Sequence, residues 1–69
     1  MYMTLIINDQ AERFDGETMT VEELLALKNI KKDGTAVAIN GKLCMKDKWS
    51  ITILSDRDDV TIISAAYGG

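Results

Sequence analysis

The sequence predicts an α+β domain in which one main helix packs across a mixed sheet of about five strands, in the order β-β-α-β-β-β. Three observations support this prediction. Short runs rich in β-branched and large apolar residues flank a single amphipathic helical segment. A helix start signal stands at Thr20, and Asn40-Gly41 is a dipeptide typical of tight β-hairpins. Because the chain has 69 residues, it has room for one domain.

The first two strands are expected to form a hairpin at the start of the chain. The segment Tyr2–Ile7 is apolar and β-branched, and the turn pair Asn8-Asp9 follows it. A shorter second strand, residues 11–14, is expected to return antiparallel to the first. Successive side chains of a strand alternate between the two faces of a sheet. The core face of the first strand should therefore carry Met3, Leu5 and Ile7.

The helix is expected to begin at about Thr20. Thr20 and Glu23 have the spacing of a capping box, in which the hydroxyl and the carboxylate each accept a hydrogen bond from an otherwise unpaired backbone N–H. The apolar residues that follow are spaced by three and four positions, so one stripe of the helix packs on the sheet. That stripe is Val21, Leu24 and Leu25, with Glu22 and Glu23 turned toward water. The charged run 28–33 is expected to be a solvated loop.

The second half of the chain is predicted to contain three more strands. Thr35–Ile39 is almost continuously apolar, which predicts a strand buried on both faces. Asn40-Gly41 then favours a tight turn, and residues 42–45 return as the next strand. The last strand is expected at residues 60–64, after the acidic turn 56–59. Three apolar side chains should anchor a loop or short helical turn to the core: Trp49, Ile53 and Leu54.

Composition and charge exclude several classes of function. The net charge is −3, the chain has no histidine, and its eight Lys and Arg are scattered among eleven Asp and Glu. Nucleic acid is not expected as a partner, because binding it relies on a concentrated positive surface. Cys44 is the only cysteine, so an intrachain disulfide is impossible and a cytoplasmic location is expected. The N-terminus lacks the pattern of a secretory signal or a membrane span, so no membrane association is expected.

The order and spacing of several short motifs resemble one protein family. The chain reads "LIINDQ" near its start, "TVEELL" at the helix, "AVAING" leading to "KDKW", and "DRDDVTII" running on to "GG". Over almost its whole length it is similar to the ThiS family, the sulfur carriers of thiamin biosynthesis in the ubiquitin-like β-grasp superfamily. The resemblance implies a β-grasp domain over residues 1–64, with the last strand beside the first and parallel to it. It also implies a flexible C-terminal Gly-Gly tail, residues 65–69.

Three positions depart from the family pattern. Arg57 stands in the acidic turn where members commonly have a glycine, and Met45 stands where they often have a proline. Both differences are expected to affect local geometry only. Tyr67 precedes the two glycines where a small residue is usual, and it would enter the channel of a partner. Tyr67 is therefore expected to influence which partner the chain binds.

The terminal glycines have a chemical interpretation. A C-terminal carboxylate has a pKa of about 3.3–3.7, so it is ionised at neutral pH and is a poor electrophile. ATP activates such a group by forming an acyl-adenylate, which a sulfur nucleophile then converts to a thiocarboxylate. The chain has five glycines but neither a G-x-x-x-x-G-K loop nor a G-x-G cluster, so the ATP site is expected in a partner. Residues 65–69 can reach about 17 Å when extended, and two residues without Cβ fit a narrow channel.

The resemblance implies the roles of these residues and partners. Gly69 is the residue that would be adenylated and would carry sulfur, with Gly68 and Tyr67 leading to it. An adenylyltransferase similar to ubiquitin-activating enzymes would act on Gly69, a cysteine desulfurase or related donor would supply sulfur, and thiazole synthase would receive it. The chain would be a carrier and not an enzyme, and it would need no cofactor, since ATP and its metal belong to the partner. Ile63 and Ala65 should point outward beside the tail and are candidate partner contacts.

The remaining candidate residues have structural explanations. Cys44 on a strand is expected to be a small buried hydrophobe, and Trp49 is expected to be a core anchor. The three aspartates of the acidic turn do not form the longer ligand series of an EF-hand, so no metal site is expected. With no histidine and no base–nucleophile pair, catalysis by the chain itself is not expected.

Two alternatives to thiamin biosynthesis remain open from the sequence. The small subunit of molybdopterin synthase would carry sulfur by the same tail chemistry to a different acceptor. A ubiquitin-like interaction module or modifier would use the same fold without sulfur chemistry. The sequence does not distinguish the final acceptor.

Overall fold

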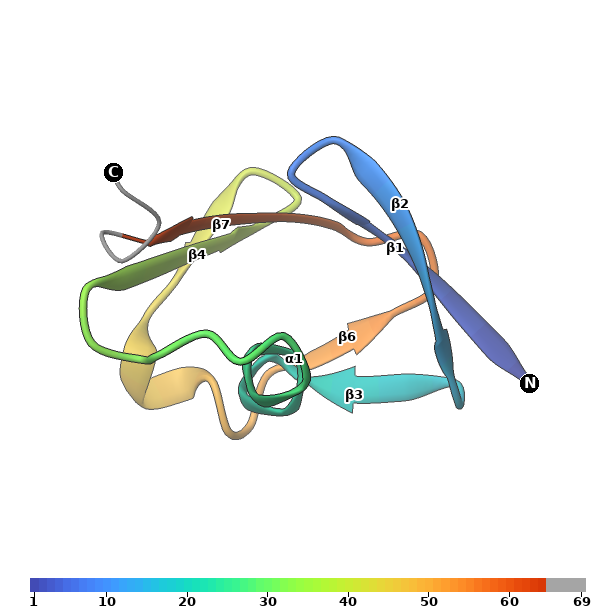
Figure 1. Ribbon diagram of the computed structural model, residues 1–69, viewed down its shortest axis with the longest axis horizontal. Helices are drawn as coiled ribbons and strands as arrows, with labels where there is room; N and C mark the ends of the chain where they lie inside the picture. The colour runs from blue at the N-terminus through green and yellow to red at the C-terminus, as the bar shows by residue number, and fades with distance from the viewer. Residues whose placement is uncertain (65–69) are drawn as a thin grey trace.

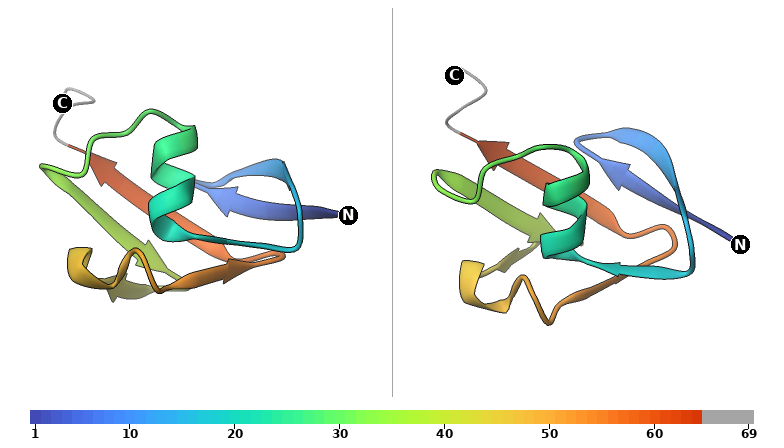
Figure 2. Two further views of the ribbon diagram at one scale, coloured as in Figure 1. Left: turned by 90° about the horizontal axis from the view of Figure 1, so that it is seen from below. Right: turned by 60° about the horizontal axis from the view of Figure 1, so that its bottom comes forward.

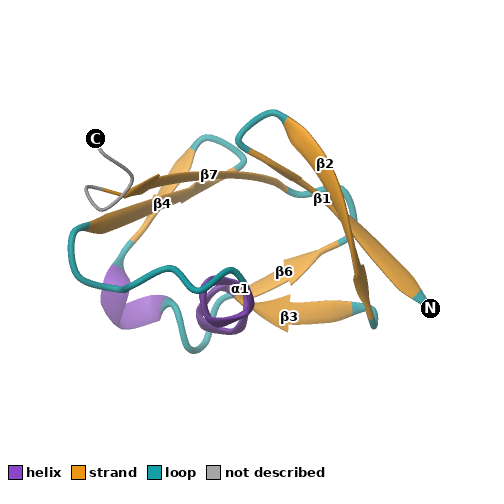
Figure 3. Cartoon of the chain, in the orientation of Figure 1, coloured by secondary structure: helices purple, strands orange, loops and turns teal. Residues whose placement is uncertain are grey.

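A computed structural model describes residues 1–64 of the chain (Figure 1). Figure 3 shows that strands dominate this part of the chain and that a single α-helix crosses them. The elements, in chain order, are β1 (Tyr2–Ile7), β2 (Gln10–Asp15), β3 (Thr18–Thr20), α1 (Val21–Leu27), β4 (Thr35–Ile39), β5 (Lys42–Cys44), the 3-10 helix η1 (Lys46–Lys48), β6 (Ile53–Ser55) and β7 (Asp59–Ser64).

The main sheet has five strands in the order β2-β1-β7-β4-β5. The last described strand, β7, lies in the middle, parallel to β1 on one side and antiparallel to β4 on the other. The two hairpins β1-β2 and β4-β5 form the flanks of the sheet. Helix α1 lies across one face (Figure 2). This arrangement confirms the predicted β-grasp fold, including the parallel pairing of the last strand with the first.

The core lies between α1 and the inner face of the sheet. Strands β1 and β7 alternate between buried and less buried residues, as one-sided packing requires. The fully buried side chains include Met3, Leu5 and Leu24, and Trp49 is 1% exposed. The predicted core faces of the first strand and of the helix are therefore confirmed, as is the role of Trp49 as an anchor.

The helix begins as its capping box predicts. The N–H of Glu23 donates to Thr20 Oγ1 at 3.1 Å, and the N–H of Thr20 donates to Glu23 Oε1 at 2.8 Å. The helix ends after Leu27, because Asn29 adopts a positive φ of 57° and the N–H of Ile30 turns back to the carbonyl of Leu25. The result is a short helix that supports one stripe of core contacts.

Two short strands were not expected from the sequence. β3 and β6 form a separate antiparallel pair in which Met19 lies opposite Leu54. Ile53 and Leu54 are predicted from the sequence to anchor a loop or short helical turn to the core; Leu54 is buried, but Ile53 is 57% exposed, so its predicted role as a core anchor is wrong. Strands of three residues are too short to show a hydrophobic period, and their pairing joins distant parts of the chain.

The prediction that Thr35–Ile39 is buried on both faces is wrong. Val37 is buried, but Ala36 is exposed and Ala38 is half-buried. Among the described residues no second layer covers the outer face of the sheet, so that face of β4 meets solvent (Figure 2). Two alanines on the outer face produced the continuous apolar run, and their small side chains expose little apolar surface.

The acidic turn before β7 is tied to the first hairpin. Asp56 Oδ1 accepts the N–H of Thr4 at 2.7 Å, and Asp58 Oδ2 accepts the N–H of Ser55 at 2.9 Å. Arg57 has a φ of 71°, in the left-handed region that favours glycine. Met45 has a φ of −69° and a ψ of 147°, which are values that proline adopts. Both departures from the family pattern therefore occupy backbone conformations that suit the family's usual residues.

We predict that Leu24→Ala lowers the free energy of unfolding by about 2–5 kcal/mol, because it opens a cavity between the helix and the sheet. Leu27→Ala is the matched control on the same helix, since Leu27 is 63% exposed and its truncation should cost less than about 0.5 kcal/mol. Urea unfolding of both variants measures the difference. Equal losses would show that the buried stripe of α1 is misassigned.

Candidate functional site

The candidate site is the C-terminal end of β7, from which the tail continues. Strand β7 pairs with β4 up to its last described residue, from Val60 opposite Ile39 to Ser64 opposite Thr35. It points toward the end of the molecule opposite the N-terminus (Figure 1). The predicted site residues Ala65, Tyr67, Gly68 and Gly69 lie outside the described residues. What the structure describes is therefore the platform that leads to the tail.

Asn8 continues the support of β7 where β1 ends. The β1–β7 ladder reaches only Ile7 and Val60, and the N–H of Asn8 donates to the carbonyl of Val60 at 3.0 Å. Beyond that point the side-chain amide of Asn8 takes the place of a strand. Its Oδ1 accepts the N–H of Ile62 at 2.8 Å, and its Nδ2 donates to the carbonyl of Ile62 at 3.1 Å. Asn8 thereby holds the backbone of Ile62 on the side of β7 where β1 has ended, while β4 pairs with β7 on the other side.

The sequence indicated Asn8 only as a turn residue. Its φ of 50° agrees with that role, because asparagine tolerates the left-handed region. Its second role depends on a residue 54 positions later in the chain. No local pattern signals such a contact, so sequence reasoning had no means of finding it.

Ser64, the last described residue, is held at the edge of the core. Its side chain is buried, and its Oγ lies 3.3 Å from Thr35 Oγ1. The Thr35 hydroxyl also donates to the carbonyl of Lys31. The tail therefore leaves a strand whose end is fixed by both backbone pairing and side-chain contacts.

The outer face of the sheet beside this strand end is apolar. Ile63 is 66% exposed and lies opposite Ala36 on β4, while Leu43 is 67% exposed and lies opposite Ala38. We call these four residues, Ala36, Ala38, Leu43 and Ile63, the outer apolar patch. The expected outward orientation of Ile63 is confirmed, whereas its role as a partner contact stays a prediction. Exposed apolar side chains that adjoin one another are typical of binding surfaces.

A shallow groove lies along the edge strand β5 and shares Leu43 with the outer apolar patch. Its volume is about 360 Å³, and it is lined by Ile39, Lys42, Leu43, Cys44, Met45, Lys48 and Thr52. Cys44 is half-buried, with its Sγ 3.5 Å from Thr52 Oγ1, so the expectation of a buried cysteine is wrong. The thiol is partly open because β5 is the edge of the sheet. Lys42 and Lys48 give this groove a positive rim.

An ion pair stands at the loop that leads into β4, beside the end of β7. Lys46 Nζ lies 2.9 Å from Asp33 Oδ1. The hydrogen bond and the charge of Lys46 lower the pKa of the Asp33 carboxyl. Because both side chains are largely in solvent, the pair contributes little to stability.

Residues 1–64 contain neither a cluster of metal-binding side chains nor a helix that could span a membrane. No group of three or more His, Cys, Asp or Glu side chains in this range is placed to hold a metal ion. The range also contains no helix with the length and apolar character needed to cross a membrane.

A five-stranded mixed sheet with a central parallel pair and one covering helix defines a protein of the ubiquitin-like β-grasp class. The model of the ThiS family matches residues 5–69. The chain belongs to the ThiS family.

Its relatives agree with this assignment. The sulfur carrier protein ThiS of Escherichia coli (strain K12) is 31% identical over 67 residues, which span 97% of this chain and the whole of that protein. The crystal structure of the thiamine biosynthesis protein (ThiS) from Geobacter metallireducens is 31% identical and superposes with a TM-score of 0.81, over 90% of this chain and 93% of that one. A solution NMR structure of a thiamine biosynthesis protein from the same organism is 27% identical, with a TM-score of 0.76 over 88% and 81% of the two chains.

We predict that Asn8→Gly lowers the free energy of unfolding by about 1–2 kcal/mol, because two partly buried hydrogen bonds to Ile62 are lost. Glycine still accommodates the positive φ of position 8. Amide hydrogen exchange at Ile62 should accelerate at least tenfold. Asp9→Gly is the matched control, since Asp9 shares the turn and has a φ of 69°. Unchanged exchange at Ile62 in Asn8→Gly would show that the side chain does not support β7.

Proposed function

We propose that the protein is a sulfur carrier in thiamin biosynthesis and that Gly69 carries the sulfur as a C-terminal thiocarboxylate. The observation that supports this most directly is the family match, which runs through Gly69 itself. The Escherichia coli relative, which is named as a sulfur carrier protein, aligns over its full length. The anchored end of β7, five residues before Gly69, is a suitable base for a tail that another protein must grip.

The chemistry requires activation of a carboxylate. A carboxylate oxygen of Gly69 attacks the α-phosphorus of ATP, an acyl-adenylate forms, and pyrophosphate leaves. The outer sulfur of a persulfide on the sulfur donor then attacks the acyl carbon, AMP leaves, and an acyl disulfide forms. A thiol attacks the donor's own sulfur in that S–S bond, so that the thiocarboxylate leaves and the thiol and the donor cysteine end as a disulfide. These steps need bound ATP and its metal, which we assign to the partner. The chain acts as a carrier and co-substrate, without a cofactor of its own.

We assign three partners to this cycle. An adenylyltransferase similar to ubiquitin-activating enzymes activates Gly69, a donor such as a cysteine desulfurase provides sulfur, and thiazole synthase accepts it. We further propose that the cycle runs in the cytoplasm. Five residues in extended conformation would span about 17 Å, a length that would let the folded body stay outside the partner's cleft.

The outer apolar patch is the docking surface that we propose for the adenylyltransferase. It lies on β4, β5 and β7, beside the strand end from which the tail emerges, so a partner that covers it would face the start of the tail. The groove along β5 meets this patch at Leu43. Such a patch with a polar surround is typical of protein interfaces.

Intact-mass measurement tests the sulfur chemistry. The purified chain is incubated with ATP, the adenylyltransferase and a sulfur donor, and we expect a mass gain equal to the replacement of oxygen by sulfur. The chain without Gly69 is the control and should gain nothing. No gain with any activator would favour a ubiquitin-like interaction module.

The acceptor is tested separately with the loaded protein. Sulfur transfer to thiazole synthase supports the proposal. Transfer only to the large subunit of molybdopterin synthase would assign the chain to molybdopterin synthesis instead.

We predict that Gly68→Val abolishes adenylation while the melting temperature changes by less than about 2 °C, because a β-branched side chain blocks a narrow channel without touching the core. Gly68→Ala should retain partial activity, since it adds a single carbon. Adenylate formation is followed by ATP–pyrophosphate exchange. Normal exchange with Gly68→Val would contradict a narrow channel.

We predict that Ile63→Asp raises the KM of the adenylyltransferase for this protein roughly tenfold or more and leaves kcat nearly unchanged, because it places an unpaired charge in the docking surface. Ile51→Asp is the matched control, since Ile51 is 67% exposed and lies outside the outer apolar patch. Equal kinetics for the two variants would remove the outer apolar patch from the interface.

A further inference from the structure

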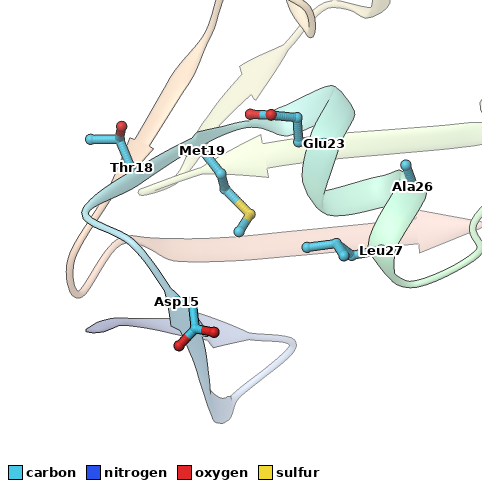
Figure 4. Close-up of a pocket in the computed structure, with 6 residues that line it drawn as sticks. All are labelled: Asp15, Thr18, Met19, Glu23, Ala26 and Leu27. Atoms are coloured by element: carbon cyan, nitrogen blue, oxygen red, sulfur yellow. The ribbon is translucent and has the colours of Figure 1, made fainter. Parts of the chain in front are cut away.

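A second groove lies between the edge strand β2 and helix α1 (Figure 4). Its volume is about 430 Å³, and it is lined by Asp15, Thr18, Met19, Glu23, Ala26 and Leu27. The three helical residues are spaced by three and four positions, so they form one face of α1. This face is distinct from the stripe that packs on the sheet. The helix therefore has a second apolar surface that the core does not use.

The groove combines an apolar floor with an acidic rim. The apolar floor includes Leu27, a surface residue that is 63% exposed, and Met19, a core residue that is 8% exposed. Asp15 and Glu23 place carboxylates on opposite sides in Figure 4. One oxygen of Glu23 accepts the N–H of Thr20 at 2.8 Å, and the residue is exposed to solvent.

No basic side chain of residues 1–64 neutralises this rim. Lys28 is nearby, but its Nζ lies 2.8 Å from Glu12 Oε1, in an ion pair that links α1 to β2. Arg13 lies over the ring of Tyr2, with its guanidinium carbon 4.6 Å from the ring centroid. Both cations are therefore engaged by other residues, and the groove presents negative charge.

The edge of β2 beside the groove offers backbone hydrogen-bonding groups. The β1–β2 hairpin turns through two residues with positive φ, which makes Ile7 and Gln10 a hydrogen-bonded pair. Hydrogen-bonded and non-hydrogen-bonded residue pairs then alternate along β1 and β2. Gly16 again belongs to a hydrogen-bonded pair, since its N–H donates to the carbonyl of Met1 at 2.7 Å. The intervening residues Ala11, Arg13 and Asp15 consequently direct their N–H and C=O groups away from β1. These groups are positioned to pair with one further strand.

We propose that the β2 edge and this groove together bind an extended basic segment of a partner protein. The segment adds a strand next to β2, places an apolar side chain on Met19, Ala26 and Leu27, and places Lys or Arg beside Asp15 and Glu23. Main-chain hydrogen bonds supply affinity in this mode of recognition, and the side-chain groove supplies specificity. The acidic rim disfavours acidic segments and a second copy of this chain, which would bring the same carboxylates.

The proposed site is remote from the tail. The end of β2 and the start of β3 lie near the N-terminus, at the side of the molecule opposite the C-terminal end of β7 (Figure 1). A partner bound there leaves the outer apolar patch open. The protein can thus be held at the β2 edge while a different partner works on its tail. This second interaction does not depend on sulfur chemistry.

An NMR titration of the full-length ¹⁵N-labelled chain tests the proposal. The probe is a blocked synthetic peptide that alternates lysine with valine or leucine, and the comparison peptide has glutamate in place of each lysine. The basic peptide should shift the amides of Ala11, Arg13, Asp15 and Leu27 and slow hydrogen exchange at Ala11 and Arg13. Its affinity should fall as salt is raised. Equal shifts with the acidic peptide, or shifts confined to the outer apolar patch, would overturn the proposal.

Charge-removing variants locate the binding site. Asp15→Asn combined with Glu23→Gln should weaken binding of the basic peptide roughly three- to tenfold, and glutamine keeps an acceptor for the Thr20 cap. Asp47→Asn combined with Asp59→Asn is the control, because it changes the net charge equally at exposed positions away from the groove. The chain without Gly69 should bind as the full chain does. Equal weakening by both double variants would show that the peptide responds only to net charge.

Discussion

The central position of β7 is the constraint on which the rest of the structure depends. The strand pairs in parallel with β1 and antiparallel with β4, so it joins the two hairpins into one sheet. Its inward side chains Val60 and Ile62 belong to the core under the helix, and strict alternation then turns Ile63 outward. Because the middle strand of a sheet is held on both sides, the segment that leads to the tail is also among the best anchored. A carrier needs this combination, since a partner must pull on the tail without loosening the body.

Only one face of the main sheet is covered, so the covered inner face and the open outer face have different roles. Helix α1 and the β3-β6 pair cover the inner face, and the outer face is left to the outer apolar patch. The C-terminal end of β7 and this patch occupy one region, while the acidic groove between β2 and α1 lies at the other end. The positive rim of the β5 groove and the negative rim of the β2 groove differ in sign, so they favour segments of opposite charge. This difference in charge is a physical basis for distinguishing between partners.

Much of the fold could be predicted because its signals are local. The capping box at Thr20, the turn at Asn40-Gly41 and the alternation in β1 and β7 each depend on residues within about four positions of one another. The misjudged features depend on neighbours that are distant in the chain. Pairing of β3 with β6, the open outer face of β4 and the partial exposure of Cys44 follow from where whole elements lie. Arg57 combines a feature that could be predicted with one that could not: the sequence predicts the turn, but not its positive φ.

The sequence by itself determined the order of the elements, the faces that enter the core and the chemistry available to a terminal glycine. These properties follow from residue type and short-range spacing, which are present in the chain before it folds. Only the tertiary structure decided that the amide of Asn8 completes the support of Ile62, across 54 positions. It also decided that the face of α1 carrying Ala26 and Leu27 borders a groove with the edge of β2. Contacts of this kind form when elements pack against each other, and no local pattern encodes them.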